Sequence, residues 1–98
     1  MYDMRISISD EQQEIAAWAD IEKTPDGQFE LALIAVADNY RNQGYGQKMF
    51  EKVLSWMREK SIKQISFLNS NRDFWTEMKK KYPKNIWLAN NLDGMIRA

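Results

Sequence analysis

The sequence contains neither cysteine nor histidine among its 98 residues. The missing cysteines exclude a disulfide and a thiol nucleophile, and the missing histidines exclude a Ser-His or Cys-His catalytic pair. Without these two residue types the chain also has no plausible zinc site. Any proton transfer near pH 7 must therefore use a carboxylate, a tyrosine, a lysine or water.

Long apolar segments and a net charge are also missing. No segment approaches the roughly 20 apolar residues of a membrane helix. The first five residues do not resemble a signal peptide, so we expect a cytoplasmic protein that does not contact membranes. The 14 Lys and Arg residues balance the 14 Asp and Glu residues, and this zero net charge argues against nucleic-acid binding.

The charges are nevertheless distributed unevenly along the chain. Residues 1–40 contain two cations and nine anions, whereas residues 41–98 contain twelve cations and five anions. A polyanionic ligand would suit the second half and a cationic substrate the first. Ordinary solvated surface is the alternative interpretation of the same pattern.

Apolar residues make up 44% of the chain and include four Trp, four Tyr and four Phe, so we expect one small folded domain over residues 1–98. Alternation over residues 2–9 predicts a half-exposed strand. Residues 14–23 favour a second strand, although three alanines leave a helix open. A Pro-Asp-Gly turn at residues 24–27 leads to a third strand, residues 28–37, whose nearly continuous apolar character predicts a central position.

The second half predicts helices alternating with strands. Residues 47–60 carry one apolar stripe and predict a helix, followed by a strand at residues 62–68. Asn71 can cap a second helix. Residues 86–98 predict a last strand that turns back at Asp93-Gly94. The order is βββ-α-β-α-β, an α/β fold class with a mixed, mostly antiparallel sheet and one parallel pair joined by a right-handed crossover.

The segment Arg41-Asn42-Gln43-Gly44-Tyr45-Gly46 joins the third strand to the first helix. A helix N-terminus presents unpaired N–H groups and the positive end of the helix dipole, which suit a phosphate or pyrophosphate. The glycines at 44 and 46 are expected to let the anion approach the backbone. The segment is not a nucleotide P-loop, because no Gly-Lys-Ser/Thr follows, and it lacks the third glycine of a dinucleotide fingerprint.

The longer string from Ile34 to Gly46 resembles the acetyl-CoA-binding motif of the GCN5-related N-acetyltransferases, the GNAT family, whose core is Arg/Gln-x-x-Gly-x-Gly/Ala. The resemblance covers roughly residues 14–83. It implies acetyl-CoA as the cofactor, with its pyrophosphate on the backbone amides of Asn42, Gln43, Gly44, Tyr45, Gly46 and Gln47 and with Arg41 opening the loop. It implies that the pantetheine arm lies beside Leu33, Ile34, Ala35 and Val36.

The family also implies a splay between the strands at 28–37 and 62–68, which makes room for that arm. A main-chain N–H polarises the thioester carbonyl in this family, and Ile34 is the best-placed match. Glu30 matches the spacing of the carboxylate base in the histone-acetylating branch, with Asp20 and Glu22 as reserves. The alternative is that Glu30 points to solvent on the exposed face of the sheet.

Several features depart from the family pattern. Many members carry a tyrosine in the second helix as the general acid that protonates the thiolate. The matching pair here is Phe74-Trp75, so Tyr82 or solvent is left as the acid. The family's asparagine before this helix is matched by Asn69 or by Asn71, which we take as a cofactor-binding candidate. The run Lys79-Lys80-Lys81 is interpreted as a solvated helix end that the helix dipole favours, with contact to CoA phosphates or self-acetylation as alternatives.

The family's N-terminal strand and two helices have no counterpart in the sequence, so an acceptor wall is expected to be missing. Either the acceptor site is open to a large substrate, such as a protein, or a second subunit closes it in a homodimer. We expect an acetyl-CoA-dependent N-acetyltransferase in which an amine, a lysine side chain or a small cationic amine, attacks directly within a ternary complex. The alternatives are a non-catalytic CoA-binding or protein-interaction module on the same scaffold, and a small interaction protein without CoA.

Overall fold

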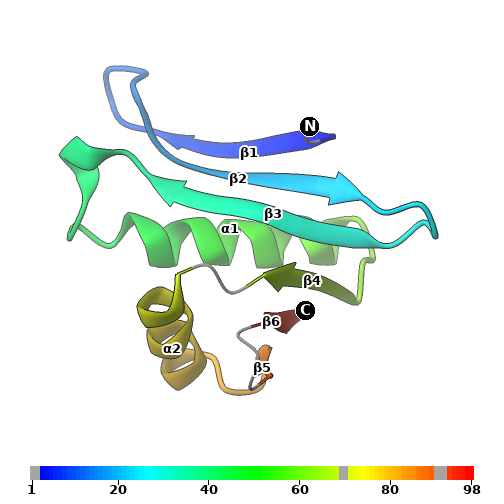
Figure 1. Cartoon of the computed structure of the whole chain (residues 1–98). Helices are drawn as coiled ribbons and strands as arrows, with labels where there is room; N and C mark the ends of the chain where they lie inside the picture. Colours follow the sequence, from blue (N-terminus) through cyan, green and yellow to red (C-terminus); the bar gives the residue numbers. More distant parts are fainter. Residues whose placement is uncertain (1–2, 69–70, 90–92) are drawn as a thin grey trace.

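The computed structural model describes residues 3–68, 71–89 and 93–98 (Figure 1). Its elements are β1 (Met4–Ser9), β2 (Ile15–Lys23), β3 (Phe29–Val36), a short 3₁₀ helix η1 (Asp38–Tyr40), α1 (Tyr45–Glu59), β4 (Gln64–Leu68), α2 (Arg72–Lys81), β5 (Ile86–Leu88) and β6 (Asp93–Arg97). The predicted order of strands and helices is confirmed, and residues 15–23 form a strand and not a helix. None of the described helices is long and apolar enough to cross a membrane.

The predicted turn at Asp93-Gly94 is wrong, because both residues belong to β6. Gly94 allows β6 to lie close to its neighbours. A Cβ atom there would lie 2.3 Å from Cζ of Phe67 and 2.7 Å from the carbonyl oxygen of Trp87. The glycine therefore serves close packing within the sheet and not chain reversal.

The six strands form one sheet in the order β1-β2-β3-β4-β6-β5. All neighbouring strands are antiparallel except β3 and β4, so the sheet is mixed and mostly antiparallel, as predicted. Within the described residues, β3 and β4 are paired only at Glu30 with Ser66 and at Leu31 with Phe67. Beyond these pairs β3 continues to Val36 without a described partner on this side, and the splay expected for this pair stays a prediction.

Both helices contribute to one hydrophobic core. α1 runs behind the sheet as viewed in Figure 1 and buries its predicted stripe, Met49, Phe50, Val53, Leu54 and Met57. α2 adds Trp75 and Met78. The Trp75 ring stacks on Phe67 with ring centroids 3.8 Å apart. The sheet buries against them a set of mainly aliphatic residues: Ala17, Ala19, Ile21, Leu31, Ile65, Phe67, Ile86 and Ile96.

The opposite face of the sheet has no helical cover within the described residues; we call it the open face. β3 is an interior strand, as predicted, but its apolar residues are not buried on both faces. Leu31 is buried, whereas Leu33, which a register shift in the pairing with β2 turns to the open face, is 42% exposed. Because side chains alternate between the two faces of a strand, the apolar run alone could not reveal that only one face is covered.

Candidate active site

The loop between β3 and α1 has a backbone shape that can bind an anion. Asn42 and Gly44 both have positive φ angles, 61° and 86°. Turns that combine left- and right-handed residues direct successive N–H groups toward one side and form anion-binding concavities. Gly44 is the N-cap of α1, no described side chain caps this end, and no acidic residue lies in the first turn. The first N–H groups of α1 are therefore available to a ligand.

The two glycines of the loop serve different purposes. A Cβ atom on Gly44 would meet no atom within 4 Å, so the positive φ angle is what requires glycine there. A Cβ atom on Gly46 would lie 2.9 Å from Cε1 of Phe74. Contrary to our expectation, Gly46 makes room for this aromatic ring from α2 and not for an approaching anion.

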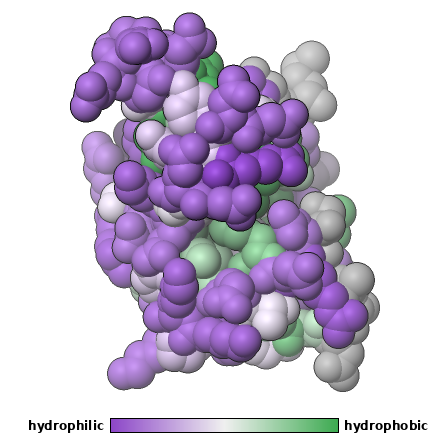
Figure 2. Space-filling view, turned by 90° about the vertical axis from the view of Figure 1, so that its left-hand side faces the viewer, coloured by the Kyte–Doolittle hydropathy of each residue, from purple (hydrophilic) through white to green (hydrophobic). Residues whose placement is uncertain are grey.

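A cleft of about 410 Å³ lies between this loop, β3 and the start of α2. Its volume falls within the roughly 300–1,000 Å³ typical of small-molecule sites. Figure 2 looks onto this end of the molecule and shows a recess with a hydrophobic floor and hydrophilic rims. Nine of the cofactor-binding candidates line this cleft, and Tyr40 and Phe74 line it as well. The full lining is Ile34, Ala35, Val36, Tyr40, Arg41, Asn42, Gly44, Tyr45, Gly46, Asn71 and Phe74.

Three proposed cofactor residues do not line this cleft. Leu33 points to the open face, as its pairing with Asp20 requires. The Gln43 side chain donates a hydrogen bond to the Asn39 carbonyl oxygen. The Gln47 side chain hydrogen-bonds to Tyr82. Gln43 and Gln47 can therefore serve a ligand only through their backbone N–H groups, which is the role the family resemblance implies.

The β3 edge that faces the cleft carries unpaired backbone groups. The Ala37 N–H donates to the Ala16 carbonyl oxygen at 2.9 Å and therefore points toward β2. N–H directions alternate along a strand, so the N–H groups of Ile34 and Val36 point away from β2, toward the other edge of β3. β4 pairs with neither residue within the described part of the chain. This edge can bind an extended ligand arm through main-chain hydrogen bonds.

The Glu30 side chain lies on the open face, at a position where β3 pairs with β4. It is half-buried, and its neighbours in register are Ser66 of β4 and Glu22 of β2. Within residues 3–68, 71–89 and 93–98 no side chain forms an ion pair or hydrogen bond with its carboxylate. Asp20 differs, because Arg5 donates two hydrogen bonds to its buried carboxylate, from Nε to Oδ1 at 2.6 Å and from Nη2 to Oδ2 at 3.0 Å. Of these two carboxylates, only Glu30 is available to act as a base.

Comparison with protein families gives this geometry a context. The model of the acetyltransferase (GNAT) family matches residues 3–78. The chain belongs to the GNAT family. No curated protein matches it by sequence.

Solved GNAT structures share the fold over nearly the whole chain. GCN5 from Tetrahymena superimposes with a TM-score of 0.70 at 17% identity, covering 95% of this chain and 66% of that one. YhbS from Escherichia coli, solved in complex with CoA, superimposes with a TM-score of 0.74 at 12% identity, covering 98% of this chain and 59% of that one. The ribosomal-protein-S18-alanine N-acetyltransferase from Escherichia coli superimposes with a TM-score of 0.66 at 15% identity, covering 95% of this chain and 64% of that one. The chain spans about two thirds or less of the length of these structures.

α2 departs from the GNAT pattern at the position of the general acid. Phe74 lines the cleft and Trp75 lies in the core, so this pair offers no hydroxyl group. The Tyr82 hydroxyl lies outside the cleft lining. It donates a hydrogen bond to Glu51 at 2.6 Å, and this bond raises the pKa of Tyr82.

Asn71, a cofactor-binding candidate, lines the cleft. Its side chain caps α2 by accepting a hydrogen bond from the Phe74 N–H at 3.3 Å. Asn69, its alternative, lies outside the described residues.

The basic run at the end of α2 is used within the fold. Lys79 Nζ donates to the carbonyl oxygens of Pro83 and Ile86 at 3.1 Å and 2.6 Å. Lys81 donates to Gln47 at 2.8 Å. Lys80 and Lys81 are exposed, as expected for a solvated helix end, whereas Lys79 is half-buried and bonds to backbone carbonyl groups.

Sequence reasoning missed the contact that supports the wall of the cleft. The Tyr40 hydroxyl donates to the Asp10 carboxylate in the turn between β1 and β2, and the Tyr40 ring meets Tyr45 edge-on at 5.4 Å. The hydrogen bond raises the pKa of Tyr40 to about 12 and lowers the pKa of Asp10. Thirty residues separate these two positions, so no local pattern in the sequence could have indicated the pair.

Proposed function

We propose that this chain is an acetyl-CoA-dependent N-acetyltransferase that transfers an acetyl group from CoA to an amine. One observation carries the proposal: the uncapped N-terminus of α1 opens into the same cleft as the unpaired edge of β3. The first feature suits a pyrophosphate and the second an amide-containing arm. CoA combines these two groups.

The residues that would hold CoA fall into two groups. The backbone N–H groups of the loop at residues 42–47 would bind the pyrophosphate, and the Arg41 guanidinium, whose side chain is 68% exposed, would add a positive charge. The backbone groups of Ile34 and Val36 would hydrogen-bond the pantetheine arm. Phe74 would cover the apolar part of that arm, because its ring already packs against the start of α1.

The proposed chemistry needs a neutral amine and a polarised carbonyl. Glu30 accepts a proton from the ammonium group of the acceptor, and the free amine attacks the thioester carbon. The Ile34 N–H stabilises the negative charge that develops on the carbonyl oxygen. As the new C–N bond forms, the C–S bond breaks; the nitrogen releases its second proton to solvent, and the thiolate takes a proton from solvent, since Phe74 and Trp75 carry no acid. No covalent enzyme intermediate forms.

The same missing acid motivates a second candidate function. A GNAT scaffold that binds CoA without turnover would keep the loop and the β3 edge and would need neither Glu30 nor an acid. Turnover distinguishes the two candidates. A cationic acceptor, a cytoplasmic location and a homodimer stay predictions from the sequence.

The test measures thiol release and acetylated product with acetyl-CoA and a panel of primary amines. Glu30→Gln should lower kcat roughly 100- to 10,000-fold, the usual contribution of a general base, with CoA affinity unchanged. Glu22→Gln is the matched control, because it removes the same charge from the adjacent strand position on the same face. Equal rates in both variants would remove Glu30 from the mechanism. Binding of CoA without turnover of any amine would favour the non-catalytic scaffold.

A further inference from the structure

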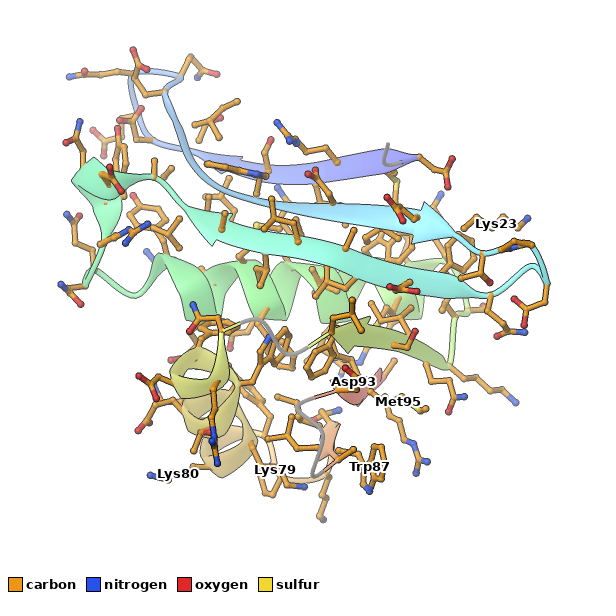
Figure 3. The ribbon with its side chains drawn as sticks, viewed as in Figure 1. Lys23, Lys79, Lys80, Trp87, Asp93 and Met95 are labelled. Carbon is orange, nitrogen blue, oxygen red and sulfur yellow. The ribbon has the colours of Figure 1, made fainter. Side chains whose placement is uncertain are left out.

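One row of side chains crosses the open face of the sheet. The strand registers pair Trp87 with Met95, Met95 with Ser66, Ser66 with Glu30 and Glu30 with Glu22. Because directly paired residues point to the same face, these five side chains form a continuous line from β5 to β2. Figure 3 shows Trp87 and Met95 close together at its β5 end.

The row is apolar at one end and acidic at the other. Trp87 is 54% exposed, and its direct neighbour on the same face is Met95 of β6. Aromatic residues and methionine are enriched where proteins bind partners, and adjacent exposed apolar side chains mark such surfaces. At the other end Glu30 and Glu22 stand directly opposite each other. The Glu30 carboxylate, which no described side chain pairs with, can meet a cation there.

The distance between the two ends constrains what can span them. Neighbouring strands lie about 4.8 Å apart, so Trp87 and Glu30, three strand spacings apart, are separated by about 14 Å. A small amine bound at Glu30 would leave Trp87 and Met95 uncovered. An extended polypeptide advances about 3.4 Å per residue, and every second side chain points the same way. Roughly four residues therefore cover the distance and return the side chain to the same side.

We propose that this row binds an extended polypeptide acceptor whose acetylated lysine lies at Glu30 and whose apolar side chain, four residues away, lies on Trp87 and Met95. The lysine ammonium meets the Glu30 carboxylate, which accepts its proton before attack. This proposal rests on the proposed acetyltransferase function and specifies its acceptor. The Glu30 carboxylate supplies charge complementarity to lysine, and Trp87 with Met95 supplies the apolar surface.

The test uses peptides of identical composition that contain one lysine and one leucine at a spacing of three, four or five residues, and a small polyamine. The spacing of four should give a kcat/KM at least tenfold above the other two. Trp87→Ala should remove this preference while leaving turnover of the polyamine unchanged. Ile15→Ala is the matched control, because Ile15 is similarly exposed at 48% but does not belong to the row.

Three results would overturn the proposal. Equal kcat/KM for all spacings, with the polyamine still acetylated, would reject the row and leave the proposed function standing. A change from dimer to monomer in Trp87→Ala, measured by sedimentation, would assign the surface to a second copy of the chain. Acetylation of neither peptides nor the polyamine by protein that binds CoA would reject both proposals.

Discussion

Replacing Gly44 by alanine separates the cost of a left-handed residue from the loss of an anion-binding loop, because the chain contains its own control. Gly27, in the turn between β2 and β3, has a φ angle of 84°, against 86° at Gly44. A Cβ atom at either position would meet nothing within 4 Å. Both substitutions therefore carry only the conformational cost of an L-residue in this region, about 1–2 kcal/mol.

The two variants should lose similar stability. For a domain of this size 1 kcal/mol corresponds to roughly 4–8 °C in Tm, so each melting curve should shift down by about 4–16 °C. Thermal unfolding followed by circular dichroism measures both shifts. A much larger loss in Gly44→Ala would indicate that the loop contributes contacts to the fold beyond its backbone conformation.

CoA binding should separate the two variants. Gly44 is the N-cap residue of α1 and lines the cleft, so a change of its backbone conformation should misalign the first helical N–H groups. Gly27 lies in the turn at the far end of the sheet from the loop (Figure 1). We expect CoA affinity to fall at least tenfold in Gly44→Ala, about 1.4 kcal/mol, and to stay at the wild-type value in Gly27→Ala. Equal affinities in calorimetric titrations would refute the anion-binding role of the loop.

Three further changes test other parts of the structure. Gly46→Ala forces the Phe74 ring to move and should weaken CoA binding, whereas adding Phe74→Leu should restore part of it; strictly additive losses in a double-mutant cycle would contradict this contact. Asp10→Asn should lower the pKa of Tyr40 from about 12 toward its ordinary value, measured by tyrosinate absorbance. Because folding raises this pKa, the contact stabilises the fold at neutral pH and is lost as the pH rises through about 12; an unchanged titration would refute it. Gly94→Ala should destabilise the fold by about 1–3 kcal/mol or more in urea unfolding, because its methyl group overlaps a buried ring; wild-type stability would contradict that packing.

The sequence predicted the parts of the fold that depend on local pattern. The apolar stripe of α1 is buried as its spacing indicated, although the helix begins at Tyr45, two residues earlier than expected, because Gly44 provides the left-handed N-cap. The string from Ile34 to Gly46 predicted the family, and this prediction is confirmed. Both successes rest on residues that are contiguous in the chain.

The features that sequence reasoning missed depend on contacts between distant segments. The reason for Gly46 lies in Phe74 on α2, and the reason for Gly94 lies in Phe67 on β4. Nothing in the β3 pattern indicates which face remains open, because that depends on where the helices pack. The side-chain row from Trp87 to Glu22 exists only once the strand order and all four registers are known.

The most direct test of the central claim is a calorimetric titration of the folded protein with CoA and acetyl-CoA. The uncapped α1 N-terminus and the open β3 edge predict binding of both with a dissociation constant in the micromolar range or below. Inorganic pyrophosphate should bind the same site more weakly and compete with them. If neither CoA nor acetyl-CoA binds to protein whose folding is verified by circular dichroism, the cleft does not serve acetyl transfer and the proposed function is wrong.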